Sequence, residues 1–255
     1  MTEATNNEQL FEYVVRIADN ALVTGQRLGE WVGHGPELEE DLALANFALD
    51  YIGQARALYT YAGEIEGAGR SEDDLAFLRD SHEFRNVLLV EQPNGDFAQT
   101  IARQFLFEAY YLRLLDALAS SNDERLAAIA ARAVKEIRYH LRHTRQWVIR
   151  LGDGTGESQR RMQDAIDRLW QYTGEMCTAD DIDSWAAESG IGPVPESLRD
   201  DWNAFVDDAL SEATLARPGN EWMASGGKEG RHTEHHGYLL AEMQFLQRAY
   251  PNSTW

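Results

Sequence analysis

Apolar residues recur at three- and four-residue steps along most of this chain, and no strand-like alternation competes with them. A stripe of this spacing extends from Pro36, a residue suited to a first helical turn, to about Glu66. We expect the stripe to face the core; it comprises Leu38, Leu42, Ala45, Leu49, Ile52 and Tyr59. An earlier helix is expected at about 7–32, and the segment GHGP at 33–36 separates the two into an antiparallel pair.

The same periodicity predicts a third long helix from its N-cap, Asp96, to about Ala119, and a fourth from Asp123 to Leu151. A short helix near 71–79 and later helices at about 158–176, 196–216 and 233–248 complete the pattern. Four long helices with C-terminal additions are typical of an all-α, four-helix bundle with inward-pointing polar groups. No linker or repeat interrupts the chain, so we expect one domain over residues 1–255.

The formal net charge is −20, from 43 acidic and 23 basic residues, which argues against nucleic acid as a partner. The acidity is compatible with a basic protein partner or with adaptation to a salty cytoplasm, and its spread along the chain favours the second. The single cysteine, Cys177, excludes an internal disulfide framework. A polar N-terminus and the lack of an 18-residue apolar run indicate no membrane span and a cytoplasmic location.

Several ionisable residues are expected to point inward, where burying an unpaired charge is unfavourable. They are Glu30, Asp50, Glu108, Glu136 and His140. Facing helices hold di-iron with one glutamate from each of two helices and Glu-x-x-His from each of the other two. These residues could therefore be ligands, or hydrogen-bonded remnants of a ligand set.

The di-iron pattern is incomplete. Ile137 stands three residues before His140, where a glutamate is needed, and the second helix has Tyr51 and Gln54 at the corresponding places. The one Glu-x-x-His match, Glu229 with His232, lies in a glycine-rich segment. We therefore expect no metal, no cofactor and no catalytic residue in this chain. Asp50 and Arg56 are expected to belong to a buried salt bridge.

Five segments in order along the chain resemble the C subunit of phenylacetyl-CoA epoxidase, the phenylacetic acid degradation protein C family. They are QRLGEWVGHGPELEEDLALAN at 26–46, LDYIGQAR at 49–56, LLVEQPNGDFAQTIARQF at 88–105, KEIRYHLRH at 135–143 and GGKEGRHTEHHGYLLAEMQFLQR at 226–248. The resemblance implies a ferritin-like fold and a stable pairing, as a dimer or heteromer, with a homologous A subunit that carries the di-iron. It further implies a small B subunit, and a reductase that brings electrons from NADPH through flavin (FAD) and iron–sulfur groups. The complex converts phenylacetyl-CoA to its 1,2-epoxide, and the C subunit is structural.

The segment GGKEGRHTEHHG offers a second group of candidates. Lys228, Arg231, His232 and His235 supply positive or switchable charge for contact with a partner subunit or with coenzyme A phosphates. The alternative is a capped loop that starts the last helix, with Thr233 as N-cap. The segment VEQPNGDF is interpreted as a turn, and the tryptophans as core residues, so that an exposed tryptophan would mark an interface.

Two other functions remain open at this point. A self-sufficient oxygenase with unusual ligands, namely Glu30, Glu108, Glu136 and His140, would bind iron. A free-standing helical binding protein would be a stable monomer without a large exposed apolar patch.

Overall fold

The computed structural model describes residues 3–219, 222–251 and 253. Helices make up 72% of the residues that the structure describes, and none of these residues belongs to a β-strand, which confirms the all-α fold and is consistent with a ferritin-like helical bundle. No helix among the described residues is both long and apolar enough to cross a bilayer. The chain divides into two compact units, residues 1–92 with 226–255, and residues 93–225. The expected single domain stays a prediction.

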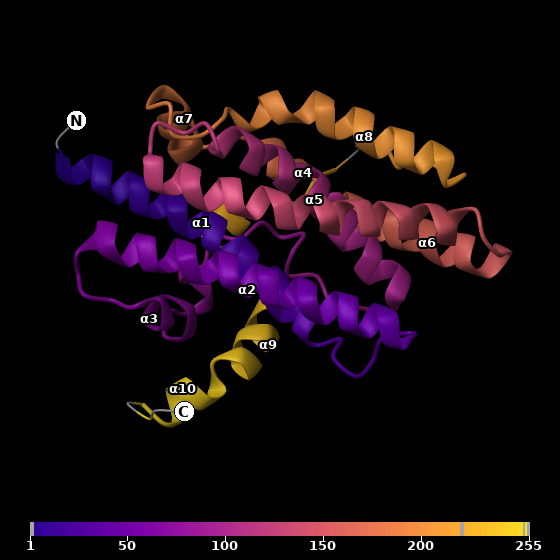
Figure 1. Ribbon diagram of the computed structural model, residues 1–255, viewed down its shortest axis with the longest axis horizontal. Helices are drawn as coiled ribbons and strands as arrows, with labels where there is room; N and C mark the ends of the chain where they lie inside the picture. The colour runs from indigo at the N-terminus through magenta and orange to yellow at the C-terminus, as the bar shows by residue number, and fades with distance from the viewer. Residues whose placement is uncertain (1–2, 220–221, 252, 254–255) are drawn as a thin grey trace. The chain divides into compact units, whose positions relative to one another are not determined.

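The first unit is built on two long antiparallel helices, α1 (Glu3–Gly29) and α2 (Leu38–Glu66), which lie side by side (Figure 1). Their backbones approach closely at Gly25, where an added Cβ would lie 3.2 Å from the carbonyl oxygen of Ala48. The shorter elements of this unit are α3 (Glu72–Phe77), the 3₁₀ turns η1 (Ser81–Glu83) and η4 (Gly227–Glu229), α9 (Glu234–Met243) and α10 (Phe245–Ala249).

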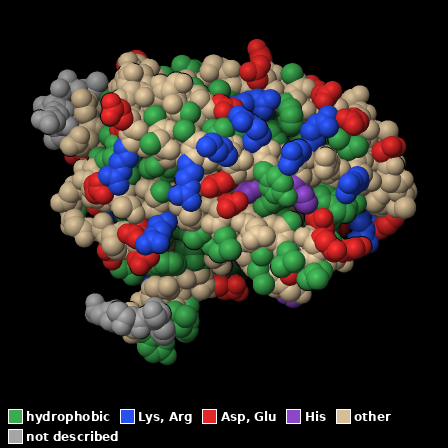
Figure 2. Space-filling view, in the orientation of Figure 1, with side chains coloured by type: hydrophobic (Ala, Val, Ile, Leu, Met, Phe, Trp, Pro, Cys, Tyr) green, Lys and Arg blue, Asp and Glu red, His purple; other side chains and the backbone are tan. Residues whose placement is uncertain are grey.

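Most of the stripe that we expected α2 to bury is exposed, and the prediction was wrong for four of its six residues, whereas Tyr59 is buried as expected. Exposed fractions range from 43% to 70% along it, at Leu38, Leu42, Leu49 and Ile52. The helix packs mainly through another side, which includes the bulkier Phe47 and Tyr51. Both sides are apolar with the same period, and the larger aromatic side chains gain more from burial. Figure 2 shows hydrophobic side chains at the surface along α2.

The second unit is built on α4 (Phe97–Leu118) and α5 (Glu124–Gly152), which pack against each other, with α6 (Gly156–Trp170) beside both. The later elements are η2 (Gly174–Cys177), α7 (Asp181–Glu188), η3 (Pro195–Leu198) and α8 (Arg199–Glu212). As expected, Asp96 caps α4, because its carboxylate accepts a hydrogen bond from the backbone N–H of Gln99 at 3.0 Å. Every residue of α4 from 98 to 111 is buried.

Three of the later predicted helices are shorter than expected, and one helix was missed. The segment 158–176 divides into α6 and η2, the segment 196–216 into η3 and α8, and the segment 233–248 into α9 and α10. Sequence reasoning missed α7, which a capping box between Asp180 and Asp183 begins. Cys177 is buried. Trp170 and Trp202 are core residues, but Trp222 is 67% exposed.

Candidate functional site

A buried cluster of ionisable side chains lies in the first unit, where Glu91 meets the start of α9. The Glu91 side chain is fully buried, and its carboxylate accepts hydrogen bonds from Asn86 Nδ2 at 3.0 Å and from the backbone N–H of Thr233 at 2.6 Å. Its oxygen Oε2 lies 2.7 Å from His232 Nδ1. A carboxylate at a helix N-terminus satisfies N–H groups that the helix itself leaves free. Glu91 therefore fastens α9 to the turn-rich segment 86–92.

The surroundings of His232 fix its charge. Nδ1 faces the carboxylate of Glu91, and Nε2 lies 3.1 Å from the carbonyl oxygen of Phe84. Both neighbours are acceptors, so both ring nitrogens donate and the ring is an imidazolium. Burial alone would lower the pKa of His232, but the hydrogen bond and the charge of Glu91 outweigh it and raise the pKa. Burial would likewise raise the pKa of Glu91, and His232 holds it below its usual value instead.

His236 is the neutral member of the cluster. Its ring stacks on that of His232 with centroids 4.1 Å apart, and its Nδ1 lies 2.8 Å from Ser81 Oγ. Burial, followed by the positive charge of His232, lowers the pKa of His236 to about 4. The positive charge of the stacked pair therefore resides on His232, where Glu91 balances it.

Glu91, His232 and His236 are the one group among the described residues whose side chains could together reach a metal ion. Their arrangement does not suit one. Both nitrogens of His232 are occupied as donors, and the carboxylate of Glu91 already accepts three hydrogen bonds. The guanidinium of Arg27 lies close by and donates to the Glu91 carbonyl at 2.7 Å, which adds positive charge. The cluster is better described as a buried ion pair.

A second buried ion pair joins α1 to the segment after α3. The carboxylate of Asp19, fully buried, forms an ion pair with Arg79 and accepts a hydrogen bond from Tyr59 Oη at 2.5 Å. It also accepts one from the backbone N–H of Arg85 at 2.7 Å. The acceptor positions on this carboxylate are thus matched by donors, which is the condition for burying a charge.

In the second unit the structure brings two of the expected polar residues into the core. Glu108 and His140 are both fully buried, from α4 and α5 respectively. Thr144 Oγ1 donates to Glu108 at 2.7 Å, and Gln104 Nε2 lies 3.4 Å from the same carboxylate. Burial lowers the pKa of His140 to about 3, although the charge of Glu136 acts in the opposite direction. The core of this unit therefore holds the neutral imidazole of His140 and the hydrogen-bonded side chain of Glu108.

The remaining candidates lie nearer the surface. Glu136 is partly exposed and lies 3.5 Å from exposed Arg132 on the same helix. Glu30 stands just beyond the end of α1, partly exposed, and pairs with Arg27 at 3.0 Å. Asp50 is half-buried.

The expected burial of Arg56 was wrong. Its side chain is 76% exposed and pairs with Glu72 at 3.3 Å, on the outer side of α2. At the positions where ligands would be needed, Ile137, Tyr51 and Gln54 are all buried. Of the five polar candidates only Glu108 and His140 are fully buried, and a di-iron centre needs about four carboxylates to balance its charge.

The glycine-rich segment forms the loop expected before the last long helix. Thr233 occupies the N-cap position of α9, although its side chain makes no capping hydrogen bond. Lys228 and His235 are half-buried, and Arg231 is 68% exposed and pairs with Glu229. His232 points inward with its side chain 3% exposed, so its role is within the fold. A surface contact by Lys228, Arg231 or His235 stays a prediction.

Sequence reasoning did not find Glu91, Asp19 or Thr144. Glu91 was hidden in a segment interpreted as a turn, although a single acid directly after the apolar run VLLV at 87–90 is a signal of a buried charge.

Residues 1–255 match the family described as phenylacetic acid catabolic protein. The chain is similar to the C subunit of 1,2-phenylacetyl-CoA epoxidase from Escherichia coli (strain K12), with 53% identity over 247 residues that cover 97% of this chain and 99% of the relative. The chain therefore belongs to the phenylacetic acid catabolic protein family.

Proposed function

We propose that this chain is the non-catalytic, structural C subunit of a phenylacetyl-CoA 1,2-epoxidase, and that it pairs with and supports the catalytic A subunit. The observation that carries the proposal is the identity of 53% to the Escherichia coli C subunit over nearly the whole of both chains. An extent of 97% of this chain takes in both compact units.

The chemistry of the core supports a role without catalysis. Glu108 accepts a hydrogen bond from Thr144, and the buried ring of His140 is neutral. Glu30 and Glu136 are partly exposed and each pairs with an arginine. These residues stabilise the helices by hydrogen bonds and ion pairs, and they leave few donors for iron.

In the proposed complex the other components supply the reaction. The A subunit holds the di-iron and the substrate site, a reductase delivers electrons from NADPH through FAD and iron–sulfur groups, and a small B subunit joins the assembly in the cytoplasm. This chain contributes a rigid surface on which the A subunit is held in its active form.

The exposed stripe of α2 is our candidate for that surface. Leu38, Leu42, Leu49 and Ile52 lie within roughly 80° of one another around the helix, at about 100° per residue. They present large aliphatic side chains to solvent in a chain of net charge −20. A contiguous exposed apolar patch marks an interaction site, because leaving it in water is unfavourable.

Co-expression with the cognate A subunit tests the proposal. The tagged A subunit is expected to retain this chain through affinity and size-exclusion chromatography, and to form epoxide from phenylacetyl-CoA only when the chain and the reductase are present. The double variant Leu42→Glu/Leu49→Glu should fold but no longer be retained. The matched control is Tyr139→Glu, an exposed aromatic residue on α5, which should be retained like the unmodified chain. Full epoxidation by the A subunit and reductase without this chain would contradict the proposal.

A further inference from the structure

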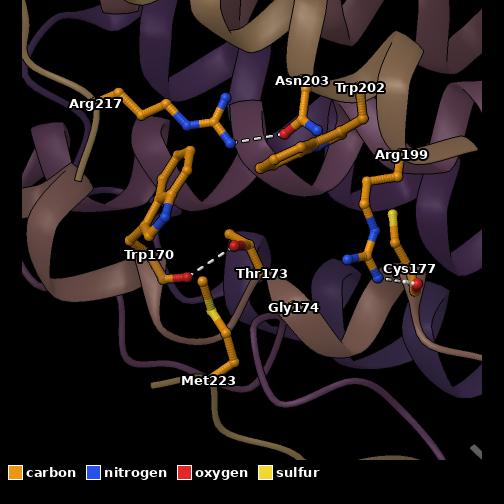
Figure 3. A pocket seen from close by; sticks show the side chains of 9 residues that line it. All are labelled: Trp170, Thr173, Gly174, Cys177, Arg199, Trp202, Asn203, Arg217 and Met223. Carbon is orange, nitrogen blue, oxygen red and sulfur yellow. Dashed lines mark hydrogen bonds between the residues drawn. The ribbon is translucent and has the colours of Figure 1, made fainter. Parts of the chain in front are cut away.

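A cavity of about 250 Å³ opens in the second unit, away from the buried polar residues described above. It lies where the C-terminal end of α6, the turn η2 and the first residues of α8 meet. Figure 3 shows Trp170 and Arg217 on one side of it and Arg199 with Cys177 on the other. Met223, from the segment that follows α8, completes the lining together with Thr173, Gly174, Trp202 and Asn203.

Two indole rings give the cavity its apolar walls. The centroids of Trp170 and Trp202 lie 5.6 Å apart, and both side chains are at most 5% exposed. The one donor of the Trp202 ring, Nε1, is used by the carbonyl oxygen of Leu106 at 3.0 Å. Trp202 therefore offers a ligand its apolar and π surface rather than a hydrogen bond.

The two arginines that line the cavity differ in whether a carboxylate balances their charge. Arg217 is paired with Asp207 at 2.6 Å, donates to Asn203 at 2.8 Å and stacks over Trp170, so its charge is balanced and its position is fixed. Arg199 donates to the Cys177 carbonyl at 2.5 Å, and no carboxylate among the described residues pairs with it. The chain has 43 acidic residues, yet the guanidinium of Arg199 has no carboxylate partner among the described residues. Because it lies beside the cavity, it is available to bind an anion there.

We infer that this cavity binds a small carboxylate with one aromatic ring, its ring against the two indoles and its carboxylate on Arg199. The size supports a single ring, because a cavity of about 150 Å³ already holds benzene, whereas sites for drug-sized ligands start at about 300 Å³. The charge supports an acid rather than an amine, since both charged residues of the lining are arginines. The planar guanidinium suits a carboxylate because it can donate two parallel hydrogen bonds. This inference does not depend on the proposed subunit role.

Ligand-observed ¹⁹F NMR on the purified full chain tests the inference, with 4-fluorophenylacetate as the probe. We expect saturable line broadening that unlabelled phenylacetate reverses. The neutral analogue phenylacetamide, of the same shape, should displace the probe at least about tenfold less well, because it lacks the charge that Arg199 would bind.

Variants locate the site. Arg199→Gln should weaken probe binding about tenfold or more, since a charge-assisted hydrogen bond is lost, and Arg217→Gln should weaken it less. Arg138→Gln, at an exposed arginine of α5 outside the cavity, is the matched control and should bind like the unmodified chain. Circular dichroism confirms folding of each variant. Absence of saturable broadening, equal displacement by phenylacetamide, or undiminished binding by folded Arg199→Gln would overturn the inference.

Discussion

The charge of Glu91 is balanced inside the fold by one particular imidazolium, that of His232, at 2.7 Å. A buried ion pair of this kind contributes little net stability compared with apolar residues of similar size. Removing one partner is nevertheless strongly destabilising, because it leaves the other charge buried without a counter-charge. The two residues come from distant parts of the chain, so their pairing ties the segment 226–255 to the segment that precedes α4.

Glu91→Gln should therefore destabilise the protein substantially. The substitution keeps the shape of the side chain but leaves the imidazolium of His232 without its counter-charge, and we expect a loss of about 3–5 kcal/mol in the free energy of unfolding. Chemical denaturation measures the loss. The matched control is Glu72→Gln, which removes the exposed pair with Arg56 and should change the free energy by less than about 1 kcal/mol. A similar, small effect of both substitutions would contradict the buried ion pair.

His236 should make the protein sensitive to acid. An imidazole in the unfolded chain takes up a proton near pH 6.5, whereas His236 in the folded protein does so only near pH 4. The unfolded state binds more protons between these values, so the free energy of unfolding falls as the pH drops from 6.5 toward 4, by on the order of 3 kcal/mol from this residue. His140, whose pKa is lowered to about 3, acts in the same direction.

Denaturation of the variant His236→Phe over this pH range checks the prediction. The variant keeps an aromatic ring in the stack but cannot titrate, so its stability should fall less steeply with acid than that of the unmodified protein. His34→Gln, at an exposed histidine, is the control variant. Parallel curves for His236→Phe and the unmodified chain would show that His236 is not held neutral.

At the scale of the helices, α2 shows how one element can carry two apolar faces. One face packs inside the first unit, and the other, with Leu42 and Leu49, reaches the surface. The two glycines of this helix, at positions 53 and 63, also lie one at the surface and one against a neighbouring segment. Gly53 is exposed, and an added Cβ there would meet nothing within 4 Å, whereas a Cβ on Gly63 would lie 2.4 Å from the carbonyl oxygen of Arg70.

Alanine at these two positions should have opposite effects. Gly53→Ala should stabilise the protein by about 0.5–1 kcal/mol, because alanine loses less backbone entropy in a helix. Gly63→Ala should destabilise it by about 1–3 kcal/mol, because the loop at Arg70 must move. Urea denaturation of the two variants checks both signs, and destabilisation by Gly53→Ala would show that its surroundings are not open.

The sequence predicted the long helices well, because α4 and α5 combine clear periodicity with aspartate caps at Asp96 and Asp123. It did not predict which face of α2 is buried, since both faces repeat every three to four residues and only tertiary packing decides between them. It placed Glu108 and His140 in the core, but it missed Glu91 and Asp19, whose partners come from far along the chain. Such pairings follow from topology, and local spacing does not contain them.

At the scale of the whole molecule, the chain is a helical protein in which several buried carboxylates accept hydrogen bonds from donors within the protein. Glu91 and Asp19 are matched in the first unit, and Glu108 accepts hydrogen bonds in the second. The surface carries the net charge of −20 and an exposed apolar stripe on α2. These properties suit a subunit that supports a catalytic partner.

The iron content of the chain, purified alone after growth with added iron, tests this structural role most directly. We predict near-zero iron per chain with intact helical circular dichroism, because Glu108 and His140 are the only two of the five polar candidates that are fully buried. About two irons per folded chain would contradict the structural role, and would make Glu30, Glu108, Glu136 and His140 the first ligands to mutate.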